Sequence, residues 1–258
     1  MIPKIIHYCW FGRRELPSLA VKCIESWRRY LPDYEIREWN EDNFDVNIIL
    51  YTEEAYRQGK YAFVSDYARF WILYRYGGIY FDTDVEIIRP MDDIIAKGNF
   101  MGFEVDPDGE NTPGRYAPRH CFGVNPGLCM GIVKEHPTMK LMKELYEGVV
   151  FDGSKMSPWL KTVVAYTTEQ LMKEGLQNVK GIQQVGDITL YPREYFAPIN
   201  VVTGRLHITA NTHTIHHYMG TWTVASERSV KDRLRNLLPE WLLILHNRYK
   251  RRKYKITE

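Results

Sequence analysis

The chain has few cysteines, and they form no pattern that is typical of a disulfide framework or a zinc site. The four cysteines among 258 residues show no Cys-x-x-Cys spacing and no metal-site partner pattern. The sequence also has no secretory start. We therefore expect reduced thiols in a cytoplasmic protein.

Long apolar runs are absent as well. The longest uninterrupted apolar stretches are far shorter than the roughly 20 residues that a membrane-spanning helix needs, which predicts a soluble or peripheral protein. With 45% apolar and 14% aromatic residues, the chain still has enough material for one sizeable core. No internal repeat, low-complexity segment or linker divides it. We expect one domain over residues 1–230 and a separate tail over residues 231–258.

The motifs of several hydrolase classes are missing too. There is no Gly-x-Ser-x-Gly elbow and no His-Glu-x-x-His zinc helix, and no motif supports a Ser or Cys nucleophile. Gly123, Gly127 and Gly131 recur at a period of four, but without the strand–glycine–helix context of a phosphate-binding loop. These glycines indicate close packing or a loop that faces a sugar.

Charge is unevenly distributed along the chain. Residues 231–258 contain nine Lys or Arg and three acidic residues, a net charge of +6, so residues 1–230 carry −4 of the total of +2. An apolar stretch at 241–245 and a basic run at 248–255 suit adsorption to an anionic membrane surface. A C-terminal helix on the core, with a solvated basic end, explains the same pattern equally well. Nucleic acid is not expected as a partner, because the rest of the chain is acidic.

Hydrophobic periodicity predicts alternating strands and helices. Strands are expected at 4–10, 34–39 and 79–85, and helices at 19–30, 61–76, 137–146 and 159–175. This order predicts an α/β fold with a mainly parallel sheet, whose ligands bind beyond the carboxyl ends of the strands. The polar stretch at 106–118, rich in Pro and Gly, is expected to be a surface loop or lid.

The pair Asp82 and Asp84 is the most informative feature of the chain. Apolar residues alternate through 79–85, and this alternation predicts a strand with Tyr80, Asp82 and Asp84 on one face. Two neighbouring carboxylates repel each other unless a cation lies between them. Hard divalent cations such as Mg²⁺ and Mn²⁺ prefer oxygen ligands and commonly bring phosphates with them. The pair therefore indicates a metal–diphosphate site, although such pairs also occur in solvated turns.

Asp66 and Arg69 lie on the helix that precedes this strand. They are three residues apart, so they share one face of a mostly apolar helix. Such a helix accepts both charges only when they pair with each other or meet a ligand. A buried structural ion pair and a substrate-binding pair both fit, and the guanidinium of Arg69 can bind oxygens with its fork of donors.

Aromatic and imidazole residues stand near both ends of the domain. Trp10 ends the first strand, where it can stack on a base or simply pack at the rim of the core. His216 and His217 precede Gly220 and can supply an imidazole to a metal, although a lone histidine is usually structural. Trp222 can close over a ligand or be packed.

Four separated motifs occur together in one order. They are Ile2-Pro3-Lys4-Ile5-Ile6-His7-Tyr8-Cys9-Trp10-Phe11-Gly12, Phe63-Val64-Ser65-Asp66-Tyr67-Ala68-Arg69, Tyr76-Gly77-Gly78-Ile79-Tyr80-Phe81-Asp82-Thr83-Asp84 and Thr214-Ile215-His216-His217-Tyr218. With these motifs the chain resembles glycosyltransferase family 32, the Asp-x-Asp sugar transferases of capsule and cell-surface polysaccharides and of fungal mannosylation. It is distantly similar to the glucosylating domains of large clostridial toxins.

The resemblance implies a Rossmann-like fold of the GT-A type, a nucleotide-sugar donor, Mn²⁺ or Mg²⁺ as the cofactor, and retention of the anomeric configuration. Asp66 and Arg69 match the pair that holds the donor sugar and diphosphate. Asp82 matches the residue that contacts ribose, sugar or metal-bound water, and Asp84 matches the direct metal ligand. Tyr80 matches a residue near the phosphates.

The resemblance also assigns roles to residues at the two ends of the domain. Trp10 matches the aromatic residue that stacks on the donor base, and the segment that contains Trp222 matches the one that closes the site. The toxins place an acidic metal ligand five residues before their Trp, and the corresponding position here is His217.

Donor, acceptor and location follow from the same resemblance as expectations. A UDP-hexose is favoured over GDP-mannose as the donor, and a glycan or lipid-linked saccharide is expected as the acceptor. The basic tail fits a glycan that is built on a lipid carrier, which suggests peripheral attachment to the cytoplasmic face of a membrane. We expect same-face attack by the acceptor hydroxyl, with the leaving phosphate as the base.

Two alternative functions remain open at this level. Asp82-Thr83-Asp84-Val85 also fits the signature of haloacid-dehalogenase-type phosphatases, in which the first Asp is phosphorylated. That signature usually lies on the first strand and is followed by further acidic metal motifs, which the chain lacks. The second alternative is a sugar-binding protein without catalytic activity, and the presence of all four charged residues argues against it.

Overall fold

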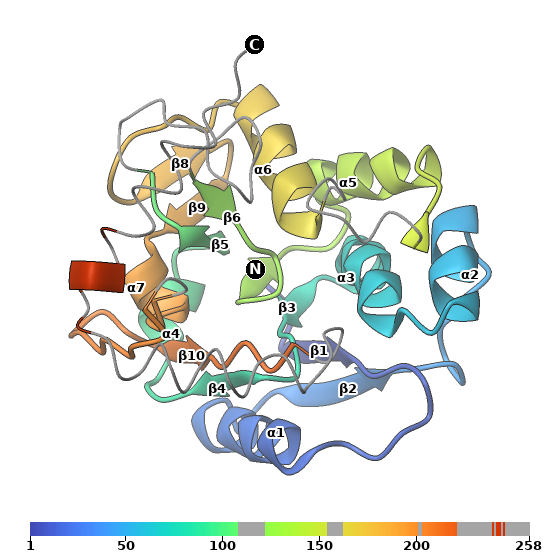
Figure 1. Ribbon diagram of the computed structural model, residues 1–258, viewed down its shortest axis with the longest axis horizontal. Helices are drawn as coiled ribbons and strands as arrows, with labels where there is room; N and C mark the ends of the chain where they lie inside the picture. Colours follow the sequence, from blue (N-terminus) through green and yellow to red (C-terminus); the bar gives the residue numbers. More distant parts are fainter. Residues whose placement is uncertain are drawn as a thin grey trace.

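The computed structural model of the chain describes residues 1–107, 122–153, 162–200, 203–220, 239, 241–243 and 245 (Figure 1). Ten strands are described: β1 (Ile5–Cys9), β2 (Glu35–Trp39), β3 (Gly78–Tyr80), β4 (Val85–Ile87), β5 (Asn99–Val105), β6 (Gly123–Val124), β7 (Met130–Ile132), β8 (Gln183–Val185), β9 (Ile188–Tyr191) and β10 (Thr214–His216). The described helices are α1 (Ser18–Tyr30), α2 (Leu50–Arg57), α3 (Tyr61–Tyr76), α4 (Asp92–Ile95), α5 (Pro137–Glu147), α6 (Val163–Lys173) and α7 (Arg193–Phe196).

The central sheet has eight strands in the order β2-β1-β3-β7-β5-β9-β8, with β6 beside β5. β1 is parallel to both β2 and β3, and β5 is parallel to β9. β7 is antiparallel to β3 on one side and to β5 on the other, so β1, β2, β3, β5 and β9 all run in one direction. The expected α/β class with most strands in one direction is confirmed.

The expected helices correspond closely to those of the structure. The helices expected at 19–30, 61–76 and 137–146 are α1, α3 and α5. The one expected at 159–175 is α6, which begins at Val163; residues 159–161 lie outside the described residues. Most of the loop or lid expected at 106–118 lies outside them as well.

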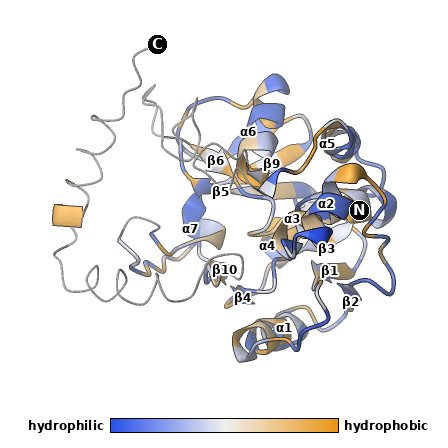
Figure 2. Cartoon of the chain, turned by 45° about the vertical axis from the view of Figure 1, so that its right-hand side comes forward, coloured by the Kyte–Doolittle hydropathy of each residue, from blue (hydrophilic) through white to orange (hydrophobic). Residues whose placement is uncertain are grey.

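Helix α1 forms because its apolar residues recur at helical spacing. Ala20, Cys23, Ile24 and Trp27 are buried, and the charged residues between them face outward. Figure 2 shows this mixture of hydrophobic and hydrophilic residues along α1. The helix packs against β4, and the indole Nε1 of Trp27 donates a hydrogen bond to the carbonyl of Val85 at 2.7 Å. This contact anchors β4, the strand that follows the two aspartates.

Two glycines connect α3 to β3. Gly77 and Gly78 have φ angles of +64° and +110°, which residues with a side chain rarely adopt. A Cβ on Gly78 would lie 2.6 Å from the carbonyl oxygen of Ile5. The double glycine therefore lets the chain leave the helix and pair closely with β1.

The segment with the two aspartates differs from the expected continuous strand over 79–85. β3 ends at Tyr80, residues 83 and 84 form a turn, and β4 begins at Val85, whose N–H donates to the carbonyl of Asp82 at 3.1 Å. The break occurs because β3 pairs within the central sheet, whereas β4 leaves it to pair antiparallel with β10. The aspartates therefore lie at the carboxyl end of β3, in the loop between two sheets.

Buried apolar side chains form two clusters. One includes residues of α2, α3, α5 and α6, and the other includes residues of α1, α4 and α7. Both clusters also contain strand residues of the central sheet. Within the described residues, no helix combines the length and apolar content that crossing a bilayer requires.

Candidate active site

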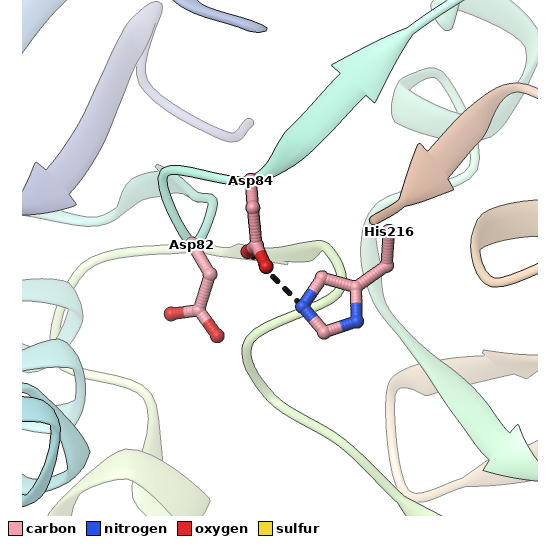
Figure 3. Close-up of side chains that lie close together, drawn as sticks. All are labelled: Asp82, Asp84 and His216. Carbon is pink, nitrogen blue, oxygen red and sulfur yellow. Dashed lines mark ion pairs between the residues drawn. The ribbon is translucent and has the colours of Figure 1, made fainter. Parts of the chain in front are cut away.

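Asp82, Asp84 and His216 come together at the carboxyl end of β3 (Figure 3). The two aspartates belong to the turn before β4, and His216 ends β10, which pairs with β4. One potential ligand atom of each residue lies within 4.8 Å of those of the other two. Asp84 and His216 are buried, and Asp82 is partly open to solvent. The turn and the antiparallel pairing therefore bring two carboxylates and an imidazole from distant parts of the sequence into one cluster.

The buried carboxylate of Asp84 is held from several directions. Its Oδ1 lies 3.2 Å from Nε2 of His216, and its Oδ2 accepts a hydrogen bond from the backbone N–H of Met219 at 2.6 Å. Burial alone would raise the pKa of Asp84, but the His216 ring and the Met219 N–H outweigh burial and hold the pKa at about 2. Burial lowers the pKa of His216, but Asp84 more than compensates and raises it to about 9. In the absence of a metal the two side chains therefore form an ion pair.

Arg69 joins α3 to the aspartate turn. Its Nη2 lies 3.1 Å from Oδ1 of Asp66 and 3.3 Å from Oδ1 of Asp82. Its Nε donates to the carbonyl of Ser65 at 3.0 Å, and its guanidinium lies 4.9 Å from the centre of the Tyr80 ring. Thus the structure brings together Asp66, Arg69, Tyr80 and Asp82.

Burial controls the electrostatics of this group. It raises the pKa of Asp66 to about 7, opposed by Arg69 and reinforced by the negative charge of Asp82. Burial also disfavours the charged form of Arg69, but the neighbouring groups, Asp82 above all, raise its pKa above the usual range. Arg69 is therefore a permanent cation, and Asp66 can change its protonation near neutral pH.

One hydrogen-bond donor of Arg69 indicates that the site binds a ligand. Its Nη1 is buried and has no hydrogen-bond partner among the described residues. A buried guanidinium donor without a partner is costly, and an anionic oxygen would satisfy it. The same atom lies 2.9 Å from the position that a Cβ on Gly127 would occupy, and Oδ2 of Asp82 lies 1.9 Å from that position. Only glycine at position 127 leaves Asp82 and Arg69 where they are.

The residues present fit a divalent cation. The donors of Asp82, Asp84 and His216 are two carboxylates and an imidazole, a set that suits Mn²⁺ and is compatible with Mg²⁺ through its oxygens. The site also has more carboxylates than cations, since Glu104 of β5 interacts with the charges of Asp82 and His216. A bound divalent cation would offset this excess of negative charge.

Other expected site residues are placed differently. The Nε2 of His217 lies 2.8 Å from Oε2 of Glu86, whose other oxygen lies 3.0 Å from Nζ of Lys22. The imidazole beside the aspartates is therefore that of His216, and His217, which the sequence indicated as the metal ligand, faces Glu86. Trp10 follows β1, is partly buried and donates from Nε1 to the carbonyl of Arg14 at 2.6 Å. Trp222 lies outside the described residues.

Sequence reasoning missed two residues of this region, Asn125 and Glu104. The side chain of Asn125 accepts a hydrogen bond from the N–H of Gly127 at 2.7 Å, and the carbonyl of Gly127 accepts one from the N–H of Asp82 at 3.0 Å. Glu104 lies close enough to His216 for the two charges to interact. The period of four at Gly127 was a visible signal, but no motif marked Glu104 or Asn125.

Comparison with known proteins finds a similarity over the segment that carries this site. Residues 17–101, which include both aspartates, match the family described as glycosyltransferase sugar-binding region containing DXD motif. The matched segment is 85 of the 258 residues and contains the Asp82–Asp84 pair of the candidate site.

Two curated relatives are named as mannosyltransferases. Inositol phosphoceramide mannosyltransferase 1 of Schizosaccharomyces pombe is 31% identical over 47% of this chain and 40% of its own length. The initiation-specific alpha-1,6-mannosyltransferase of Candida albicans is 25% identical over 72% of this chain and 49% of its own length. The chain thus spans less than half the length of these curated relatives.

A solved structure, PaToxG glycosyltransferase, is similar with a TM-score of 0.46 and 19% identity, over 67% of this chain and 70% of that one. The comparisons favour neither the phosphatase nor the non-catalytic alternative.

Proposed function

We propose that the chain is a metal-dependent retaining glycosyltransferase of the GT-A type, which transfers a hexose from a nucleotide-sugar donor to a glycan acceptor. The observation that carries this proposal is the cluster of Asp82, Asp84 and His216 beside the guanidinium of Arg69. The cluster suits a divalent cation, and a guanidinium suits the oxygens of a diphosphate. A nucleoside diphosphate with its metal ion would satisfy both groups at once, because the metal ion would bind to the cluster and the diphosphate to Arg69.

Each charged residue then has a distinct role. Asp84 and His216 would hold the cation, with Asp82 facing it from the same turn. When bound, the cation offsets the negative charge that develops on the leaving diphosphate. Arg69 contributes a second positive charge, and its buried Nη1, which has no hydrogen-bond partner among the described residues, would donate to an anionic oxygen of the diphosphate. Asp66, which forms an ion pair with Arg69, would accept a hydrogen bond from the donor sugar.

The pairing of the carboxylates supports attack without a covalent intermediate. Asp82 forms an ion pair with Arg69, and Asp84 forms one with His216, so neither carboxylate is available as a nucleophile. We propose that the acceptor hydroxyl attacks the anomeric carbon from the face that the diphosphate leaves, and that the leaving phosphate takes its proton. Trapping a glycosylated Asp or Glu in a stalled reaction would contradict this.

The relatives suggest which sugar to test first. Mannose is the sugar in the names of the S. pombe and C. albicans relatives. We propose mannosyl transfer from GDP-mannose as the first candidate, beside the UDP-hexoses that the sequence favoured. A donor pocket distinguishes such sugars by single hydroxyl contacts, so a direct comparison of donors decides between them.

The acceptor and the location are proposals of the same kind. The name of the S. pombe relative includes a lipid, inositol phosphoceramide, and this supports a lipid-linked acceptor. We propose that the chain acts as a peripheral protein on the cytoplasmic face of a membrane, with the basic residues of 231–258 at the anionic surface. Most of that tail lies outside the described residues.

A thermal-shift screen of nucleotide sugars, with and without Mn²⁺, tests the proposed function. A donor that binds more tightly should raise the melting temperature more, roughly with the logarithm of its affinity, and only when the metal is present. Asp84→Ala should abolish the metal-dependent shift, whereas Asp42→Ala, a change at an exposed aspartate in an ion pair with Arg13, should leave it intact. Absence of a shift with every nucleotide sugar, together with turnover of a phosphate ester, would instead support the phosphatase alternative.

A further inference from the structure

The turn between β6 and β7 is closed by the side chain of its first residue. Residues 125–128 read Asn-Pro-Gly-Leu, and the proline fixes one φ angle in the range that a turn needs. The Oδ1 of Asn125 accepts a hydrogen bond from the N–H of Gly127 at 2.7 Å, and its carbonyl accepts one from the N–H of Leu128 at 3.4 Å. Asparagine before proline favours such a turn, because its amide oxygen replaces a backbone acceptor.

The same residue fixes the turn to the central sheet. The backbone N–H of Asn125 donates to the carbonyl of Gly102 in β5 at 3.1 Å, and the residue is buried. β5 lies in the interior of the sheet, between β7 and β9. Asn125 therefore connects an interior strand, through its backbone, to Gly127, through its side chain.

Gly127 meets Asp82 in two ways. The carbonyl of Gly127 accepts a hydrogen bond from the backbone N–H of Asp82 at 3.0 Å. A Cβ on Gly127 would also collide with Oδ2 of Asp82 and would lie 2.9 Å from Nη1 of Arg69. The other carboxylate oxygen of Asp82 lies 3.3 Å from Nη2 of the same arginine. A shift of the turn would therefore change both the backbone and the side-chain position of the Asp82–Arg69 pair.

We infer that Asn125 is a positioning residue, which holds Gly127 against Asp82 and so fixes the Asp82–Arg69 pair in the position that binds a diphosphate. The inference rests on the proposed function, since it needs a diphosphate at Arg69. Groups that bind a ligand stay in the productive geometry only when the residues behind them are themselves fixed by packing and hydrogen bonds. Asn125 acts through the backbone of Gly127 and not by contact with the donor.

The affinity for GDP and for UDP, titrated separately into the full chain with saturating Mn²⁺ and followed by calorimetry, tests this role. Asn125→Ala removes the acceptor of the Gly127 N–H. The Kd should rise about 5- to 10-fold, as expected for one lost hydrogen bond, and equally for whichever nucleotide binds, because both contain the diphosphate. Asn125→Ser supplies a hydroxyl oxygen that accepts from the N–H two residues on, so its Kd should stay within about 2-fold of that of wild type.

A matched variant and a double variant separate positioning from general damage. Asp45→Ala removes the same kind of bond, from the N–H of Asn47 to Oδ1 of Asp45 at 2.9 Å, in an exposed turn after β2. It should leave the Kd for the nucleotide unchanged, even where it lowers the melting temperature. In Gly127→Ala the contact with Asp82 is already disturbed, so the further change Asn125→Ala should raise the Kd by a smaller factor than it does in wild type.

The outcomes distinguish this inference from the proposed function. If wild type binds a nucleoside diphosphate with Mn²⁺ and Asp84→Ala does not, but Asn125→Ala binds as wild type does, only the positioning role is overturned. Equal losses in Asn125→Ala and Asn125→Ser, a fully additive loss in the double variant, or the same loss in Asp45→Ala would also overturn it. If wild type itself binds neither GDP nor UDP, both the proposed function and the inference fail.

Discussion

The guanidinium of Arg69 lies against the carboxylate of Asp82, with Nη2 3.3 Å from Oδ1. This contact joins α3, which carries Arg69, to the turn that carries Asp82 and Asp84, two of the three candidate metal ligands. Arg69 also binds Asp66 one helical turn earlier, and all three charges lie in or at the edge of the core. The link makes the side proposed to bind a diphosphate and the side proposed to bind a metal ion one electrostatic unit.

Replacement of Arg69 should therefore damage stability as well as activity. In Arg69→Met, Asp66 and Asp82 lose their cation, and we expect the free energy of unfolding to fall by about 3–5 kcal/mol, as when one partner of a buried ion pair is removed. Urea unfolding measures this change. Arg57→Met is the matched control, because Arg57 and Glu54 form an i, i+3 pair of the same spacing on the surface. If both variants unfold at the same urea concentration, the buried network does not contribute to stability.

Gly127→Ala should inactivate the site without disturbing the rest of the fold. The new Cβ would lie 1.9 Å from Oδ2 of Asp82, so the carboxylate has to move. Displacements of about 1 Å in an active site can cost on the order of 100-fold in rate, and we expect a loss of that size in sugar transfer. Gly148→Ala is the control, since its Cβ would meet only the carbonyl oxygen of Leu145 at 3.6 Å. Equal turnover in the two variants would show that the close approach at Gly127 is unimportant.

Much of this architecture could be predicted from local sequence patterns. The helices α1, α3 and α5 have apolar residues at helical spacing, and the double glycine marks the end of α3. The strand expected over 79–85 was wrong in its middle, because alternation of apolar residues cannot tell one strand from two short strands separated by a turn. That distinction depends on β10, which lies about 130 residues further along the chain and pairs with β4.

The candidate site, like the fold, could be predicted only in part from local sequence patterns. Asp66, Arg69, Asp82 and Asp84 could be singled out because charges stand in or beside apolar segments. The choice between His216 and His217 could not be made, since neighbouring residues on a strand point in opposite directions and only the register with β4 decides which one faces Asp84. Glu104 reaches the site through a bulge opposite β6, which no local pattern reveals.

The two histidines can be separated by experiment. In His216→Ala the cluster loses one of its three possible ligands, and we expect the Kd for Mn²⁺ to rise by at least the roughly 10-fold that loss of an orienting partner costs. In His217→Ala only the contact with Glu86 is lost, so the Kd should stay close to that of wild type. Titration of each variant with Mn²⁺ alone measures both values. The reverse result would return the ligand role to His217.

The tail should matter for membranes more than for catalysis. We expect deletion of residues 231–258 to weaken cosedimentation with anionic vesicles, because it removes a segment with a net charge of +6. Turnover of a soluble acceptor should change less. Zwitterionic vesicles serve as the control, since they lack the charge that attracts the basic residues. Unchanged sedimentation of the truncated chain with anionic vesicles would exclude the tail as the attachment site.

His7 should make the fold sensitive to acid. The residue is buried in β1, where its Nδ1 lies 3.0 Å from Nε1 of Trp39 and its Nε2 lies 2.9 Å from the carbonyl oxygen of Gly77. The indole can only donate and the carbonyl can only accept, so both bonds are satisfied by a neutral imidazole with its proton on Nε2. Burial lowers the pKa of His7 from 6.5 to about 4, against the opposing effect of the Gly77 carbonyl.

The sign of the pH dependence follows from this direction. Between pH 6.5 and 4 the unfolded chain binds a proton at His7 and the folded chain does not, so the free energy of unfolding falls as the pH is lowered through this window. We expect a loss of about 2 kcal/mol between pH 6.5 and 5 from this residue alone. Urea unfolding at both pH values should show that loss in wild type and in His207→Gln, where an exposed histidine is replaced. His7→Gln should lack it, because glutamine can donate and accept similar hydrogen bonds but does not titrate; an identical acid loss in His7→Gln would assign the sensitivity to other groups.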